Sequence, residues 1–178
     1  MKKMKKKRHL SGLTYKYTLL DEISASTVHP ISEFDRENRM GRMRHALKNI
    51  VSGESPCKID WEHCAECVNL METLIRKNSG TWLDCDGKEA QVVDASGLLD
   101  DAILAMANAG VRSSKGKGMR LDGPGIVAVT AVMDDYEDLV AQLPARTIIK
   151  AHRSTERRTM EIILYGGKKG EDIHIVDL

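Results

Sequence analysis

The chain of 178 residues is long enough for one domain with a substantial hydrophobic core, so neither disulfides nor a metal is required for folding. Its 27 Lys and Arg nearly balance its 26 Asp and Glu, so overall charge gives no argument for nucleic-acid binding, and only local clusters can. Aromatic residues make up 4% of the chain, fewer than a base-stacking surface or a large planar cofactor usually needs, and we expect no cofactor.

The N-terminal end is strongly basic. Lysines and Arg8 dominate its first positions, and we predict a mobile leader over 1–12 followed by an extended arm over 13–31. No apolar run behind the leader is long enough for a signal peptide or a membrane helix. The sequence therefore predicts a cytoplasmic protein without membrane association, in which the cysteines are reduced thiols.

Helical patterns dominate the rest of the chain, and they predict an all-α bundle of four or five helices over 32–165. The first helix begins at Ser32 and runs to about Val51. The second begins with Asp60 as its N-cap and ends at 78–80. We expect a loop over 81–87, and a third helix over about 88–109 that has Gly110 as its C-cap and a kink at Gly97.

The stretch 121–165 predicts two more helices, which meet at Leu143 and Pro144. Asp122 is suited to cap the first of them, and apolar residues spaced three and four apart give that helix one buried face. These residues are Ile126, Val129, Met133, Tyr136, Val140 and Leu143. We expect the two helices to fold into an amphipathic hairpin that sets Asp134 near Arg153. Residues 166–178 are predicted to form a short extended tail with strand-like alternation.

Three further stretches of the sequence stand out: residues 43–53, then 60–61 with 68–69 and Glu72, and finally 120–126. Together they resemble small helical proteins carried by bacterial phages and other mobile elements. The resemblance covers about residues 40–143, and its motifs are structural: a helix end, a helix start and a capped turn. It implies a genomic setting for the protein and no particular activity.

Five residues have the chemistry of zinc ligands: Cys57, His63, Cys64, Cys67 and Cys85. Thiolates with a nearby imidazole suit tetrahedral zinc, and two of these cysteines have the C-x-x-C spacing that zinc sites use. Zinc sites usually place such pairs on turns, whereas the spacing here falls inside a predicted helix. We therefore predict that these cysteines are ordinary core residues, with a zinc-stabilised module as the alternative.

The third and fourth predicted helices are joined by a basic loop punctuated by glycines. Its cations are Arg112, Lys115, Lys117 and Arg120. A helix N-terminus follows the loop, and its free amides favour anions, so a phosphate or nucleic-acid backbone is one candidate ligand. The spacing matches neither a P-loop nor a dinucleotide fingerprint, and a solvated loop is the alternative. On the last helix, Arg157 and Arg158 lie beyond the predicted acidic partners and are expected to be available to another molecule.

No nucleophile–base pair and no nucleotide-binding motif occurs, so we predict that the protein is not an enzyme. The preferred interpretation is an accessory or regulatory protein of a phage or mobile element that binds a host or element-encoded protein. A homodimer is compatible with the sequence. One alternative is a DNA- or RNA-binding regulator that uses the basic leader, the first helix and the 112–120 loop. A zinc-stabilised binding module is the other.

Overall fold

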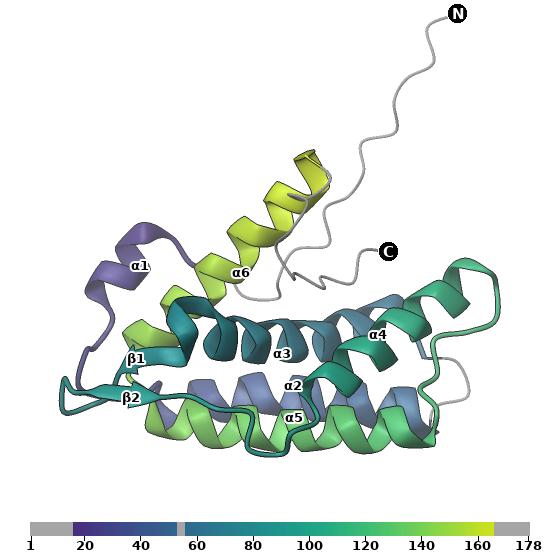
Figure 1. Cartoon of the computed structure of the whole chain (residues 1–178), viewed down its shortest axis with the longest axis horizontal. Helices are drawn as coiled ribbons and strands as arrows, with labels where there is room; N and C mark the ends of the chain where they lie inside the picture. Colours follow the sequence, from purple (N-terminus) through teal and green to yellow (C-terminus); the bar gives the residue numbers. More distant parts are fainter. Residues whose placement is uncertain (1–15, 53–55, 166–178) are drawn as a thin grey trace, which may run out of the picture.

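The computed structural model describes residues 16–52 and 56–165, which form an all-α fold with a two-stranded sheet (Figure 1). The predicted fold class is confirmed. Its elements are α1 (Leu19–Ser24), α2 (Glu33–Ser52), α3 (Lys58–Arg76), the 3-10 turn η1 (Lys77–Gly80), β1 (Thr81–Leu83), β2 (Glu89–Gln91), α4 (Leu99–Ser114), α5 (Gly123–Gln142) and α6 (Ala145–Tyr165). The predicted leader over 1–12 and tail over 166–178 lie outside the described residues.

Helix α3 is the centre of the bundle and packs against α2, α4, α5 and α6 (Figure 1). Its residues Leu70, Met71 and Leu74 have no exposed surface. The predicted apolar face of α5 is confirmed, because its central residues are fully buried. These are Val129, Met133, Tyr136 and Val140. None of the helices in the described ranges combines the length and the apolar character needed to cross a membrane.

The start of α5 is fixed by a cap and by close packing on α4. Asp122 is the predicted N-cap, and its carboxylate accepts a hydrogen bond of 2.8 Å from the N–H of Gly125. A Cβ atom at Gly125 would lie 2.8 Å from the Cβ of Ala105 on α4, closer than two carbon atoms can approach. Glycine at this position therefore sets the distance between the two helices.

The predicted pairing of the last two helices is wrong. Helix α6 packs against α3 and α1, and its C-terminal part extends away from the bundle (Figure 1). Asp134 pairs with Arg44 of α2 at 2.6 Å, while Arg153 pairs with Glu22 of α1. The apolar side of α6 turns toward α3, where the hydroxyl groups of Thr155 and Thr73 form a buried hydrogen bond of 2.6 Å.

The predicted extended arm over 13–31 contains a helix. Thr18 caps α1 by accepting a hydrogen bond of 3.2 Å from the N–H of Asp21, and the Asp21 carboxylate accepts one of 2.6 Å from the N–H of Thr18. The segment after α1 is fastened to the start of α6, because the N–H of Ala145 donates to the carbonyl of His29 at 2.8 Å. Helix α1 is therefore held to α6 both by its own ion pair and by the segment that follows it.

The predicted loop over 81–87 and the predicted helix start at 88 are also corrected. Strands β1 and β2 form an antiparallel hairpin in which Trp82 is paired with Ala90. Trp82 is buried, and its indole N–H donates to the carbonyl of Leu74 at 2.6 Å, which anchors the hairpin to the end of α3. Helix α4 begins only at Leu99.

Turn chemistry delays the start of α4, and the helix also ends later than predicted. The Asp94 carboxylate accepts hydrogen bonds from the N–H groups of Gly97 and Leu99, at 3.1 and 3.0 Å. Gly97 has a φ of 67° and lies in this turn, so it marks no helix kink. Gly110 is buried inside α4 instead of capping it.

Candidate functional site

Three neighbouring features at one end of the molecule form the best candidate site, and the first is an apolar ridge on α1. Its three side chains, Leu19, Leu20 and Ile23, are 56%, 75% and 58% exposed. The opposite side of α1 faces α6, where Glu22 pairs with Arg153 and the carbonyl of Ile23 accepts a hydrogen bond from Arg146. Polar bonds to α6 thus hold the helix with its apolar side chains toward solvent. We call these three residues the α1 ridge.

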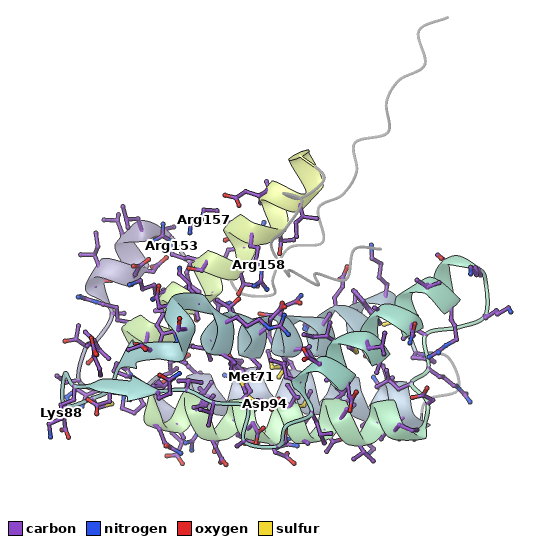
Figure 2. The ribbon with its side chains drawn as sticks, in the orientation of Figure 1. Met71, Lys88, Asp94, Arg153, Arg157 and Arg158 are labelled. Carbon is purple, nitrogen blue, oxygen red and sulfur yellow. The ribbon has the colours of Figure 1, made fainter. Side chains whose placement is uncertain are left out.

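The second feature is a group of basic side chains on the adjoining face of α6. We define the α6 cation cluster as Lys77, Lys150, Arg153 and Arg157. The spacing of its α6 members places them on one face of the helix. Figure 2 shows Arg153 and Arg157 on the side of α6 that faces α1. Lys77 comes from η1 and reaches α6 by donating a hydrogen bond to the hydroxyl of Ser154.

The α6 cation cluster is electrostatically crowded. Burial lowers the pKa of Lys77 below its usual value, and the charges of Arg157 and Lys150 lower it further. Glu22 acts in the opposite direction. Within residues 16–52 and 56–165, the Arg153–Glu22 ion pair is the one salt bridge of this cluster. An added anion would therefore relieve repulsion among these cations.

The third feature is a pocket of about 340 Å³ between the hairpin, the α1–α2 connection and the start of α6. Its apolar lining includes Val28, Trp82 and Leu83. Lys150 lines the α6 side, so the pocket borders the α6 cation cluster at this residue, whereas Asp86 and Glu89 line the hairpin side. We call this cavity the hairpin pocket. Its size is at the lower end of the range for ligand sites, and its two walls carry opposite charges.

A buried polar network lies beneath this surface, where α6 packs against the bundle. Arg39 of α2 is 1% exposed and donates one hydrogen bond to the hydroxyl of Tyr136 at 3.2 Å and another to Nε2 of His152. Tyr17, just before α1, accepts a third from Arg39 at 2.5 Å, and its ring meets the His152 ring edge-on. Nδ1 of His152 lies 3.8 Å from the Glu66 carboxylate of α3. The network joins four helices to the segment that leads into α1.

The protonation states in this network follow from burial. Burial lowers the pKa of His152 well below its usual value, and the Arg39 charge lowers it further, so the imidazole is neutral. Because Nε2 accepts from Arg39, the proton of the neutral ring is on Nδ1, on the side of Glu66. Burial raises the pKa of Tyr136, so this phenol stays protonated.

A second buried ionic group lies further along α6. Glu72 of α3 has no exposed side-chain surface, and its carboxylate pairs with Arg158 at 2.8 Å and with Arg76 at 3.2 Å. Figure 2 shows Arg158 on the side of α6 that faces α3, away from Arg157. Arg157 is exposed and belongs to the α6 cation cluster. Arg158 differs from the expectation that it is available to another molecule, because it is the counterion of a buried carboxylate.

The 112–120 loop lies at the other end of the molecule (Figure 1). Lys115 and Lys117 are exposed, as is Arg120. Arg112 is half-buried and donates a hydrogen bond to the carbonyl of Arg120, so it closes the loop.

Two further observations weaken the loop as an anion site. Met119 is 7% exposed and anchors the loop in the core. The Asp122 carboxylate already occupies the N-terminus of α5, where a phosphate would bind. The structure therefore does not join this loop and Arg157 into one basic surface.

The candidate zinc ligands are dispersed. Among the described residues, no three His, Cys, Asp or Glu side chains are grouped so that they could hold a metal ion. Cys64 and Cys67 are buried, and burial raises the pKa of Cys64 to about 12 and that of Cys67 well above its usual value. Cys57 is exposed, Cys85 is half-exposed and His63 is half-buried. The arrangement of Cys64 and Cys67 is that of core thiols.

Sequence reasoning missed the α1 ridge and the hairpin pocket. A signal for the ridge was present, because Thr18 and Asp21 have the spacing of a capping box at the start of the segment that contains Leu19, Leu20 and Ile23. The pocket had no such signal, since it is formed by segments distant in the sequence. No family model matches the chain, and comparisons with curated proteins and with solved structures gave no significant match.

Proposed function

We propose that this protein is a non-enzymatic accessory or regulatory protein of a phage or other mobile element, which works in the cytoplasm by binding a host or element-encoded protein. The resemblance of residues 40–143 to small helical proteins of such elements supports the genomic setting. The α1 ridge carries the proposal for protein binding. Leu20 is 75% exposed on a helix that polar bonds hold in place, and an ordered apolar surface of this kind is typical of protein interfaces.

The neighbouring charges favour a different protein as the occupant over a second copy of this chain. A twofold interface centred on the α1 ridge would bring the same surface of both copies together. The α6 cation cluster adjoins the ridge, so Lys150 and Arg157 of one copy would approach the same cations of the other. Like charges across an interface are unfavourable, whereas a partner with acidic residues beside an apolar patch complements this surface.

The experiment compares three tagged full-length proteins: wild type, Leu20→Glu and Val127→Glu. Val127 is 61% exposed on α5, so both variants add one acidic residue in place of an exposed apolar one, and both should melt at the wild-type temperature. Proteins captured from host lysate are identified by mass spectrometry, purified and mixed with each variant. We expect a stoichiometric complex with wild type and with Val127→Glu that Leu20→Glu does not form. Equal binding by all three proteins, or self-association alone, would refute the proposal.

A further inference from the structure

The α1 ridge, the α6 cation cluster and the hairpin pocket together form the proposed docking surface, and its charge indicates the chemistry of the molecule that binds there. The α6 cation cluster contributes four basic groups, and among the described residues its salt bridge is to Glu22 alone. Lys150 is exposed, borders the hairpin pocket and lies close enough to Lys77 to affect its charge. Positive charge and an apolar cavity therefore meet at Lys150.

We propose that this surface binds an acidic peptide segment of the partner protein, with carboxylates on Lys150 and Arg157 and a neighbouring apolar side chain in the hairpin pocket. The inference rests on the proposed function and specifies its partner. Anchoring one apolar side chain in a pocket beside charge-assisted contacts is a common way in which proteins recognise peptides. The 340 Å³ of the pocket is ample for one large side chain.

The acidic residues around the site favour a peptide over a nucleic acid. Asp86 and Glu89 line the far wall of the hairpin pocket, and Asp21 is exposed on α1. A nucleic-acid strand carries one charge on every phosphate and would meet these carboxylates on leaving the α6 cation cluster. A peptide carries its carboxylates only where its sequence places them. It can also use the α1 ridge, which offers nothing to a phosphate backbone.

The test begins with a random peptide library displayed on phage and selected on immobilised full-length protein. Selected peptides are synthesised with a fluorophore, and their affinities are measured by anisotropy against wild type, Lys150→Glu, Arg157→Glu and Lys117→Glu. Lys117 is exposed on the distant 112–120 loop, so its reversal is a control with the same change of charge. Leu83→Ser alters the apolar lining of the pocket at a side chain that is 55% exposed, which leaves folding intact.

We expect the selected peptides to combine Asp or Glu with a large apolar residue. Their affinity should fall about tenfold or more for Lys150→Glu and Arg157→Glu, fall for Leu83→Ser, and remain unchanged for Lys117→Glu. Failure to enrich any peptide would overturn the inference, as would peptides without acidic residues or peptides that bind Lys150→Glu as tightly as wild type. So would binding of a duplex DNA of about 20 base pairs at physiological salt that competes with the peptide.

The two proposals fail separately. If the captured partner depends on Leu20 but binds Lys150→Glu and Arg157→Glu normally, the partner-binding function stands and the acidic peptide is wrong. If peptides behave as expected and no protein complex depends on Leu20, the peptide site stands and the proposed use of the α1 ridge is wrong.

Discussion

Arg39 of α2 and His152 of α6, 113 positions apart, share a hydrogen bond in the interior of the protein. Both side chains are 1% exposed, and a charged guanidinium next to an imidazole is compatible only with the neutral ring. The other groups that face His152 are the Glu66 carboxylate of α3 and the ring of Tyr17. The Tyr136 hydroxyl of α5 shares the Arg39 donor with it. Protonation of His152 would break this hydrogen bond, so the packing of α6 on the bundle depends on pH.

The first prediction concerns acid. His152 has a pKa in the folded protein well below the value of about 6.5 expected in the unfolded chain, so the unfolded state binds more protons as the pH falls. The contribution of His152 to stability is complete above pH 6.5 and is lost below it, at up to about 1.4 kcal/mol per pH unit. Urea denaturation between pH 7.5 and 5, at intervals, measures the slope. His152→Gln should be less stable at pH 7.5 and show a flatter slope, and equal slopes would contradict the assignment.

A second prediction concerns the buried carboxylate of Glu72. Arg158→Met removes one of its two partners and should cost about 3 kcal/mol, the lower end for breaking a buried pair, because Arg76 remains. The double variant Glu72→Met with Arg158→Met should recover much of that loss. The control on the same helix is Arg153→Met, whose partly exposed pair with Glu22 should contribute at most about 1 kcal/mol. Chemical denaturation of wild type, Glu72→Met, Arg158→Met and the double variant gives the coupling between the two residues, and additive effects at Glu72 and Arg158 would disprove it.

Third, Gly125→Ala should destabilise the protein by about 1–3 kcal/mol, because the new methyl group would clash with Ala105 and with the Asp122 carboxylate. Gly41 lies inside α2, and an added Cβ there meets nothing within 4 Å. Gly41→Ala should therefore be neutral or stabilising by up to about 1 kcal/mol. Thermal melts of the two variants should shift in opposite directions or differ clearly in size, and similar shifts would contradict the close α4–α5 packing.

The fourth prediction tests the crowding of the α6 cation cluster without any ligand. Arg157→Gln removes a positive charge near Lys77, so the pKa of Lys77 should rise toward its usual value of 10.5. NMR titration of isotopically labelled lysine side chains measures this shift directly. Lys115→Gln changes the same charge on the distant loop and should leave Lys77 unaffected. If the pKa of Lys77 were unchanged in Arg157→Gln, these two cations would not interact.

Capping residues and the spacing of apolar residues correctly predicted the helices in which they occur. Asp122 and the spacing of Val129, Met133 and Tyr136 predicted α5, since a cap and a buried face are properties of neighbouring residues. Strands β1 and β2 were not predicted, because each has three residues and an alternation of apolar and polar residues cannot be recognised over so short a segment. The turn at Asp94, after which α4 begins, could have been recognised from the sequence, but the predicted helix ran through it.

The direction of α6 was beyond local reasoning. Its basic residues had plausible partners on α5, and its true ones, Glu22 and Glu72, are on α1 and α3. The choice depends on how Leu143 and Pro144 orient the helix and on the shape of the α3 surface, which are properties of the assembled core. The α6 cation cluster and the hairpin pocket depend on the same choice, so the sequence indicated Arg157 as a candidate without indicating its surroundings.

Because α1 contributes no buried residue and packs mainly against α6, its stability is largely separate from that of the core. Detaching α1 breaks the Glu22–Arg153 pair and the bond to the Ile23 carbonyl while the apolar interior stays intact. Such a unit opens at a fraction of the global unfolding free energy, and its amides exchange with solvent much sooner than those of α3. A partner that binds the closed α1 therefore slows this exchange, and its affinity includes the energy of keeping α1 closed.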